Sequence, residues 1–523
     1  MAVTENSIPT DLGAQLTRIG DTIRLWAEHS PNLPALAEAG GAWSYGELVS
    51  AIAETEIWLS HAGVRPGDRV MIVCENCRSF VAMLMAVAHL DAWPVLANAR
   101  LSASEVDKIR DHCGARLIVY TVAASPRAAD HAKRHGASIQ ELGDAGSVAI
   151  GALNENVEPE PVASNPAERV AALIYTSGST GIPKGVMLTH KNLLFMASTS
   201  SKIRKLTPSD RLYGILPMSH AVGLSVVLLG SLLCGASVYL SPRFDPMTAR
   251  RTLEKERLTI VLGVPAMFAQ MVEYAKIRGL KKLDLPDLRI ISTSGAPLHP
   301  ATKAAVEELF GLMLHNGYGI TECSPTIAQA IPEEPRTDTS VGKILPGLEV
   351  KFVGFDGGEV GLGEVGELRV RGPNVMKGYY RAPEETAAAI DSDGWFNTRD
   401  LARLEDGFLF IVGRTKELIV RFGFNVYPAE VEAVLSSHPG VVRSAVIGLP
   451  AQGSGGEDVI AFVQLLPGSS STAVDLERYA AERLAPYKRP SQIYVVPEMA
   501  LTPTGKIMKA MLLESVSRAV PEK

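Results

Sequence analysis

The segment Tyr175–Gly185 has the sequence YTSGSTGIPKG and follows the apolar run AALI at residues 171–174. An apolar run that ends in small hydroxylated residues and glycines predicts a strand leading into a tight loop. Such a loop presents backbone N–H groups and hydroxyls to phosphate oxygens, and Lys184 adds a cation. It is not a Walker loop, because Pro183 stands where that motif requires a glycine before the lysine. The segment therefore predicts a phosphate-binding loop of another type.

Around this loop, helical and strand patterns alternate, which indicates a layered α/β architecture. Capping boxes at Ser44 (SYGE) and Ser102 (SASE) predict helix starts, and the runs RVMIV and LIVY predict strands between the helices. From Ser340 to Arg371 short β-rich runs replace the helices, and a compact α/β pattern returns after Arg414. The predicted fold class is α/β, with a β-rich subdomain completing a large N-terminal domain (1–415) and a small, mobile α+β C-terminal domain (416–523).

The composition of the 523 residues excludes several kinds of partner. The net charge of −6 gives no field that would favour nucleic acid or an anionic membrane, so we expect small-molecule partners. Five scattered cysteines, including a CxxC at Cys74 and Cys77, predict neither a disulfide framework nor a zinc site and suit a reducing cytoplasm. The first fifteen residues have no apolar core, so no signal or transit peptide is expected.

The segment Leu212–Pro242 contains no Asp, Glu, Lys or Arg and is long enough to cross a bilayer. Pro217, His220 and several glycines interrupt it. These breaks favour a loop, a buried helix near residues 224–233 and a strand near residues 237–240 over a membrane span. We therefore expect no integral membrane segment.

Four further motifs follow the phosphate loop in order. They are NGYGITE (316–322), FNTRD (396–400), GRTKELI (413–419) and PTGK (503–506). Together with the loop, they resemble the adenylate-forming superfamily of acyl-CoA synthetases, aryl-CoA ligases, luciferases and peptide-synthetase adenylation domains. The resemblance covers nearly the whole chain and implies ATP, Mg²⁺ and coenzyme A as cofactors and a carboxylic acid as substrate.

The resemblance implies a nucleotide site with residues from every motif. Tyr318 would stack on adenine, Asp400 would bind the ribose hydroxyls, Arg414 would contact the ribose or α-phosphate, and Thr176 with Glu322 would hold Mg²⁺. For Arg414, a surface ion pair with Glu417 remains an alternative. The family has a glycine before the ribose-binding Asp, where this chain has Arg399. The remaining nucleotide-binding residues that it implies are Ser177, Gly178, Ser179, Thr180, Gly181, Lys184, Gly295, Ala296, Pro297, Asn316, Gly319 and Thr321.

Three parts of the C-terminal region receive roles from the same resemblance. Lys506 would stabilise charge on the pentavalent phosphorus, together with Glu322, Thr321 and Lys184. Lys416 matches the hinge about which the C-terminal domain swings between two half-reactions. Gly423 and Phe424 match the loop lining the channel for the pantetheine arm of CoA, although Phe422 departs from the usual Gly or Lys before that glycine. Lys509 is interpreted as a surface charge.

The uncharged segment supplies the substrate pocket by resemblance, with His220 near the bound carboxylate and Val222, Gly223 and Ser294 lining the tail pocket. A core role for His220 is the alternative. Residues 218–237 contain no acid to pair with an α-ammonium group, so the expected substrate is a neutral-tailed aryl, cinnamyl or medium-chain acyl acid.

The predicted function is an ATP-dependent acid:CoA ligase. A stand-alone adenylation enzyme that loads an acyl carrier protein is the first alternative, since both acceptors end in the same thiol. A non-catalytic nucleotide-binding or scaffold protein is the second, and it would need a broken motif, which the sequence does not have. The oligomeric state stays open, a homodimer included.

Overall fold

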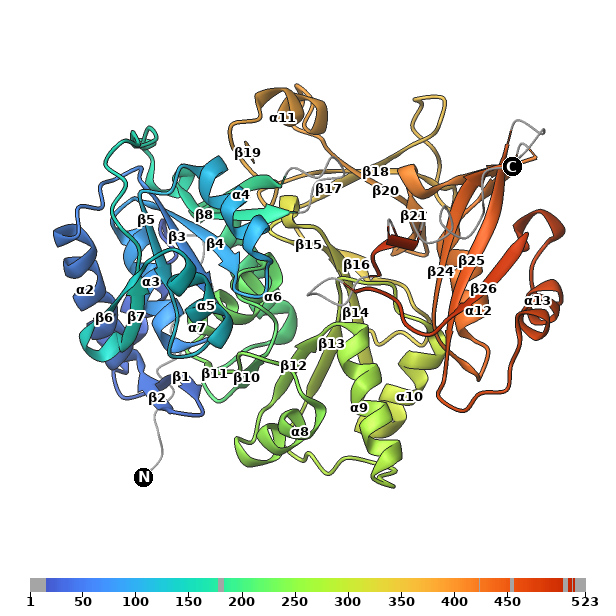
Figure 1. The fold of residues 1–523 in the computed structure, drawn as a ribbon, viewed down its shortest axis with the longest axis horizontal. Coiled ribbons are helices and arrows are strands. Elements are labelled where there is room, and N and C mark those ends of the chain that lie inside the picture. Colours follow the sequence, from blue (N-terminus) through green and yellow to red (C-terminus); the bar gives the residue numbers. More distant parts are fainter. Residues whose placement is uncertain are drawn as a thin grey trace.

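The computed structural model describes residues 16–176, 183–422, 424–451, 456–501, 507–509 and 511–512. Its helices and strands form a large α/β part, a β-rich part and a smaller C-terminal part (Figure 1). Both predicted capping boxes are present, since Ser44 and Ser102 accept hydrogen bonds from the backbone of Glu47 and Glu105. The α-helices within these ranges are α1 (Asp21–His29), α2 (Tyr45–His61), α3 (Arg78–His89), α4 (Ala103–Cys113), α5 (Pro126–Arg134), α6 (His190–Arg204), α7 (Gly230–Leu233), α8 (Pro246–Lys255), α9 (Pro265–Ile277), α10 (Pro300–Phe310), α11 (Pro383–Ala389), α12 (Pro428–Ser436) and α13 (Ala473–Ala481).

One mixed sheet holds the strand that precedes the phosphate loop. Its central strands β3, which is the predicted run RVMIV, and β4 are buried along their whole length. The neighbour of β4 on the other side, β8, pairs antiparallel with β9. The order of this sheet is β19 (Gly378–Tyr379), β9 (Lys184–Thr189), β8 (Val170–Thr176), β4 (Trp93–Asn98), β3 (Arg69–Cys74), β5 (Leu117–Tyr120), β7 (Ser147–Ile150) and β6 (Ser138–Glu141).

A second mixed sheet gathers the motifs at the ends of its central strands. Strands β10, β12, β13 and β14 run parallel, so their carboxyl ends meet at one edge, which is where open α/β sheets bind ligands. Residues 294–297 follow β13, and residues 320–322 follow β14. The order is β16 (Lys343–Ile344), β15 (Thr326–Gln329), β14 (Leu314–Gly319), β13 (Ile290–Thr293), β12 (Ile260–Gly263), β10 (Arg211–Gly214), β11 (Ser237–Leu240), β1 (Pro34–Glu38) and β2 (Gly41–Ser44).

The uncharged segment folds largely as its breaks predict. It consists of β10, a loop, a buried helical stretch and β11. The helical stretch differs from the expectation, since it begins as a π-helix, η4 (Val222–Leu229), before continuing as α7. Within the described ranges, no helix combines the length and the apolar character needed to cross a membrane.

The β-rich region is the predicted antiparallel sheet, in the order β17 (Glu349–Val353), β18 (Gly366–Arg371), β20 (Phe396–Glu405) and β21 (Phe408–Arg414). A short 3₁₀ helix, η6 (Thr415–Glu417), follows it. The C-terminal part then has its own core, built on the hairpin β22 (Ile419–Arg421) and β23 (Phe424–Val426) and on the sheet β24 (Val441–Pro450), β25 (Glu457–Leu465) and β26 (Gln492–Val496). In Figure 1 this sheet lies at the opposite end of the molecule from β3–β8.

Candidate functional site

The phosphate end of the site is bounded by the two strands that flank the predicted loop. Thr176, the last residue of β8, is the register partner of Lys184, the first residue of β9. The loop residues Ser177, Gly178, Ser179, Thr180 and Gly181 lie outside the described residues. Next to the loop, the Tyr175 hydroxyl and His112 Nδ1 are 2.7 Å apart, which ties the end of β8 to α4. The strand predicted before the loop is therefore confirmed as β8, and the structure adds a second strand, β9, from Lys184.

Glu322 lies in the 3₁₀ turn η5 (Thr321–Cys323), directly after β14. The Tyr379 hydroxyl donates a hydrogen bond to Glu322 Oε1 at 2.8 Å, and the Glu322 carbonyl accepts from the Met376 N–H at 2.8 Å. Burial first, and then the Glu322 carboxylate, raise the pKa of Tyr379, so its hydroxyl stays protonated as a donor. The Lys184 ammonium lies 5.0 Å from the centre of the Tyr379 ring. Tyr379 thus joins the strand after the phosphate loop to Glu322.

No group of three or more His, Cys, Asp or Glu side chains capable of holding a metal occurs among the described residues. The predicted magnesium ligands, Thr176 and Glu322, are too few to form such a group. Mg²⁺ takes few protein ligands in nucleotide sites and completes its octahedron with phosphate oxygens and water. One carboxylate, Glu322, and one hydroxyl, Thr176, are a donor set of that kind.

The predicted ribose ligand Asp400 lies in β20 opposite Arg414 of β21. The carboxylate is 3% exposed; Oδ2 accepts from the Tyr318 hydroxyl at 2.5 Å, and Oδ1 lies 2.9 Å from Arg414 Nε. Burial lowers the pKa of Arg414, but the carboxylates of Asp400 and Glu417 outweigh it and raise the pKa overall. The direct ion pair of Arg414 is therefore with Asp400. Tyr318, Asp400 and Arg414, three residues predicted from three motifs, are in contact.

The two departures from the family pattern have a common backbone explanation. Arg399, where the family has glycine, has φ of +58°, and Phe422 has φ of +53°. Both values lie in the left-handed region that glycine adopts most readily. The Arg399 N–H donates to the Asn397 side chain at 2.8 Å, which supports the turn. The departures therefore change side chains while keeping the backbone conformation of a glycine.

The segment Ser294–Pro297 (SGAP), which contains the predicted nucleotide-binding residues Gly295, Ala296 and Pro297, follows β13. Ser294 continues the strand pairing through its N–H to the Gly263 carbonyl at 3.3 Å, and Gly295 turns the chain with φ of +84°. Ala296 and Pro297 follow in the loop that precedes α10. Nearby, Gly319 cannot be larger, since an added Cβ would lie 2.2 Å from the Pro325 carbonyl oxygen.

Asn316 has a different environment from the one that the resemblance implies. Its side-chain amide donates to the Thr339 carbonyl at 3.0 Å, and its Oδ1 accepts from the Gly317 N–H at 3.0 Å. The side chain is 5% exposed. Asn316 therefore anchors β14 to the loop before β16 in this structure, and its two polar atoms already have backbone partners.

A cavity with about 400 Å³ of empty space, part of it open to solvent, lies beside these residues. Val222 and Ser294 line it, as the resemblance implies, whereas His220 and Gly223 are not among its lining residues. The His220 N–H bonds to the Pro217 carbonyl at 3.1 Å, and burial lowers the pKa of the imidazole. An added Cβ on Gly223 would lie 2.3 Å from the Pro217 carbonyl oxygen, so this glycine permits the tight turn into η4. The other lining residues are Arg204, Val226, Leu262, Ser292, Thr293, Gly295, Tyr318, Gly319, Pro325, Thr326 and Gln329.

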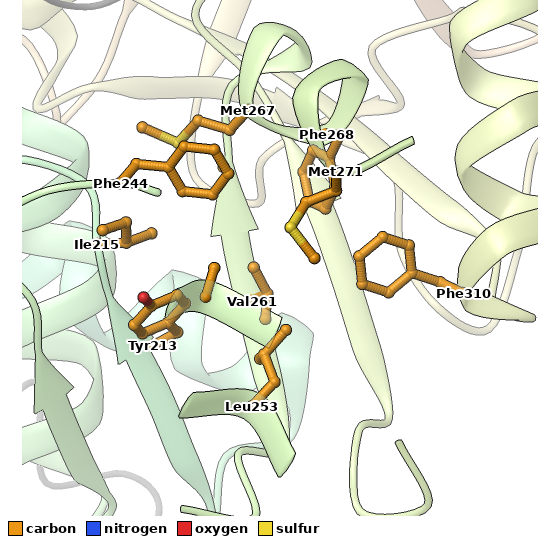
Figure 2. A pocket seen from close by; sticks show the side chains of 11 residues that line it. Tyr213, Ile215, Phe244, Leu253, Val261, Met267, Phe268, Met271 and Phe310 are labelled. Carbon is orange, nitrogen blue, oxygen red and sulfur yellow. The ribbon is translucent and has the colours of Figure 1, made fainter. Parts of the chain in front are cut away.

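A second cavity lies on the other face of β12. Val261 and Gly263 line it, whereas Leu262 between them lines the first cavity, as expected from the alternation of side chains along a strand. Figure 2 shows its apolar side chains converging from β10, β12, α8, α9 and α10. Among the described residues, no charged side chain and no residue of the five motifs lines it. The first cavity, which adjoins the motif residues, is therefore the candidate substrate site.

The C-terminal residues are described in part. Lys506 and Gly423 lie outside the described residues, although Leu501 and Ile507, on either side of the PTGK loop, pair with each other. Phe424 is 55% exposed and stacks on Tyr487 with ring centres 4.7 Å apart. The hinge candidate Lys416 is exposed in η6, at the junction between the β-rich sheet and the C-terminal core.

Lys509 corrects one expectation, because it is not a surface charge. Its side chain is 24% exposed, and its ammonium lies 2.8 Å from both Glu417 Oε2 and Glu432 Oε1. Burial lowers the pKa of Lys509, but the two carboxylates raise it overall. The lysine therefore ties the chain just after the PTGK loop to η6 and α12.

Several residues of the site have no sequence signal of their own. Tyr379 belongs to a short edge strand outside the five motifs. Arg204 ends a helix among the basic residues Lys202 and Lys205, a pattern that ordinarily indicates a solvated helix terminus. Gln329 lies in a four-residue strand. The pairing of β14 with β15 and the packing of α6 bring Gln329 and Arg204 to the cavity, whereas the pairing of β19 with β9 brings Tyr379 to Glu322.

Comparison with known proteins agrees with the motifs. The sequence profile of the AMP-binding enzyme family matches residues 23–380, and that of the AMP-binding enzyme C-terminal domain matches residues 430–506. The chain is 36% identical to a feruloyl-CoA synthase from Amycolatopsis sp over 92% of its own length and 96% of that protein. It is 31% identical to 4-coumarate–CoA ligase 3 from Oryza sativa subsp. japonica over 93% of its own length and 89% of that protein. Its fold matches ATP-bound MatB from Rhodopseudomonas palustris with a TM-score of 0.83 at 29% identity, covering 96% and 99% of the two chains. The chain therefore belongs to the AMP-binding enzymes, the adenylate-forming acyl-CoA synthetases that its motifs resemble.

Proposed function

We propose that this enzyme is an ATP-dependent acid:CoA ligase that activates an aryl acid as its adenylate and transfers the acyl group to CoA. The observation that carries the proposal is the arrangement around the first cavity, with Glu322 and Tyr379 at the phosphate end and Tyr318, Asp400 and Arg414 at the ribose end. The relatives named feruloyl-CoA synthase and 4-coumarate–CoA ligase support an aryl acid. One of the solved structures with this fold contains ATP, which supports ATP as the nucleotide.

In the first half-reaction, a carboxylate oxygen of the acid attacks the α-phosphorus of ATP. A new O–P bond forms, the bond to the pyrophosphate oxygen breaks, and acyl-adenylate and pyrophosphate result. Asp400 accepts hydrogen bonds from the ribose hydroxyls, and Arg414 adds a cation near the α-phosphate. Thr176 and Glu322 would hold Mg²⁺ with the phosphate oxygens, and the ion would neutralise charge on the leaving pyrophosphate.

In the second half-reaction, the CoA thiol attacks the acyl carbon, the bond to AMP breaks, and the thiol proton leaves to solvent. This step uses the other face of the C-terminal domain, presenting Gly423 and Phe424 to the pantetheine arm. We place the domain boundary at residues 415 and 416, with Lys416 as the hinge. A reducing cytoplasm suits the five cysteines, which form no disulfides within the described residues. A homodimer is proposed as the assembly, and a measurement of the particle mass in solution tests it.

The test incubates the purified protein with MgATP, CoA and a panel of aryl, cinnamyl and medium-chain acids, and measures pyrophosphate and thioester separately. Both products are expected with at least one aryl acid. Pyrophosphate without CoA thioester would favour an acyl carrier protein as acceptor. No pyrophosphate with any acid would contradict the proposal.

Replacing Tyr379 by phenylalanine is expected to lower kcat/KM for pyrophosphate release by about 10-fold, because a hydrogen bond to a charged group contributes about 1.5–3 kcal/mol. The Glu322 carboxylate loses the donor that orients it, so half-saturation with Mg²⁺ should shift to a higher concentration. Tyr380→Phe is the matched control, since the neighbouring hydroxyl bonds to Glu160 instead, at 2.5 Å. An unchanged Mg²⁺ dependence in Tyr379→Phe would show that the contact does not orient the metal ligand.

Amino acids are expected to be poor substrates, and phenylalanine with 3-phenylpropanoate is the matched pair that tests this. The two acids differ by the α-ammonium group, for which the described lining of the cavity offers no carboxylate. An unpaired buried ammonium should reduce kcat/KM by at least about 100-fold. Pyrophosphate release that is equal for the two acids would contradict the assignment of the cavity.

A further inference from the structure

Arg204 is the one charged side chain that lines the first cavity among the described residues. It is 6% exposed, so its guanidinium is removed from water. Its Nη1 donates to the Ser200 carbonyl at 3.2 Å, and its Nη2 donates to Gln329 Oε1 at 3.1 Å. A guanidinium has five N–H donors, so these two bonds leave donors for a ligand.

The charge of Arg204 has no counterion among the described residues. No salt bridge joins it to a carboxylate, and burial alone lowers its pKa to about 10. The nearby His315 is not a counterion either, since an imidazole carries no negative charge. Burial and the cations of Lys303 and Arg204 lower its pKa, which favours the neutral form. A buried cation without a partner is unfavourable, and buried charges in proteins are ordinarily paired. The site is therefore incomplete without an electron-rich group from elsewhere.

Two further polar groups in the same lining lack partners. The hydroxyls of Ser292 and Thr293 are buried without a hydrogen bond, although the residues are 3% and 2% exposed. Gln329 is different, since its Nε2 bonds to the Asn316 and Ala330 carbonyls at 3.2 Å and its Oε1 accepts from Arg204. These bonds fix the Gln329 amide. The hydrogen-bonding groups that remain free for a ligand are therefore the Arg204 guanidinium and the hydroxyls of Ser292 and Thr293.

The register of β14 and β15 separates this polar cluster from the nucleotide. Gly319, next to the 3₁₀ turn with Glu322, pairs with Thr326, whereas Gln329 pairs with Gly317. Two residues along a strand span roughly 7 Å, about the width of an aromatic ring. The Arg204 cluster therefore lies deeper in the cavity than the end at which adenylate would form.

We propose that Arg204 binds a hydrogen-bond-accepting oxygen at the end of the acid remote from the reacting carboxylate. The oxygen belongs to a phenol or to a second carboxylate, and Ser292 and Thr293 supply further hydrogen bonds to it. This inference rests on the proposed function and specifies its substrate class. Arg204 lies outside the uncharged segment that led to the expectation of a wholly neutral tail.

The test measures kcat/KM of the wild-type enzyme for pyrophosphate release with 3-phenylpropenoic acid and its 4-methyl, 4-hydroxy and 4-carboxy derivatives. Methyl and hydroxyl groups have nearly the same size, so their comparison isolates the hydrogen bond. We expect the 4-hydroxy or the 4-carboxy acid to exceed the 4-methyl acid by about 10- to 100-fold. The better of the two identifies the oxygen as phenol or carboxylate.

The variant Arg204→Met keeps most of the side-chain volume, and we expect it to bring the ratio of the preferred acid to the 4-methyl acid close to one, mainly through KM. Arg127→Met, which removes an exposed arginine on α5, should keep the wild-type ratio. A wild-type enzyme that uses the 4-methyl acid as well as both oxygen-bearing acids would overturn the role of Arg204 while leaving the proposed function intact. No pyrophosphate from any of the four acids, with activity on straight-chain acids, would overturn both the aryl proposal and this inference.

Discussion

Lys506→Ala is expected to slow acyl-adenylate formation by about 100- to 1000-fold, the effect typical of losing one preorganised charge donor at a transition state. Thioester formation from supplied acyl-adenylate should remain close to normal, because the family resemblance assigns this lysine to the first half-reaction only. Single-turnover pyrophosphate release and thioester formation, measured separately, check the expectation.

Lys281→Ala is the control for the removal of a positive charge, since Lys281 is an exposed residue in the connection after α9. It should leave both half-reactions unchanged. An equal loss in both half-reactions of Lys506→Ala would instead mean that Lys506 supports folding. Unimpaired adenylate formation would remove it from the chemistry altogether.

Lys416→Pro is expected to form acyl-adenylate and pyrophosphate but to make thioester about 100-fold more slowly. Lys416 lies in the 3₁₀ helix η6, a conformation whose φ is close to the value that proline imposes. Proline therefore suits this backbone, whereas an orientation with a different φ would be disfavoured by about 3 kcal/mol. If the swing of the C-terminal domain turns on this residue, the step that needs the second orientation slows.

Lys416→Ala removes the same charge and keeps the backbone free, so both steps should be nearly normal in that variant. The decisive measurement is thioester formation from supplied acyl-adenylate beside single-turnover adenylation. A proline variant that makes thioester at the wild-type rate would place the pivot elsewhere, or would show that no domain swing is needed.

The local patterns of the sequence predicted much of the fold. The strand before the phosphate loop, the two capped helices and the antiparallel sheet after Ser340 are found where hydrophobic periodicity and turn residues place them. The π-helix at Val222 is the exception, since an apolar run without charges does not distinguish one helical hydrogen-bonding pattern from another. Lys509 was mistaken for a surface charge, because its partners Glu417 and Glu432 are more than seventy residues away in the chain.

By itself, the sequence determined the family resemblance, and with it the predicted nucleotide-binding residues, because each of the five motifs is a short, local run of residues. The tertiary structure decided which of them touch, as in the hydrogen bond from the Tyr318 hydroxyl to Asp400 of β20. It alone placed Tyr379 against Glu322 and Arg204 against Gln329, over separations of 57 and 125 residues. Such contacts depend on sheet order and helix packing, which join segments that are distant in the chain. The residues next to such a side chain in the sequence therefore do not indicate its partner.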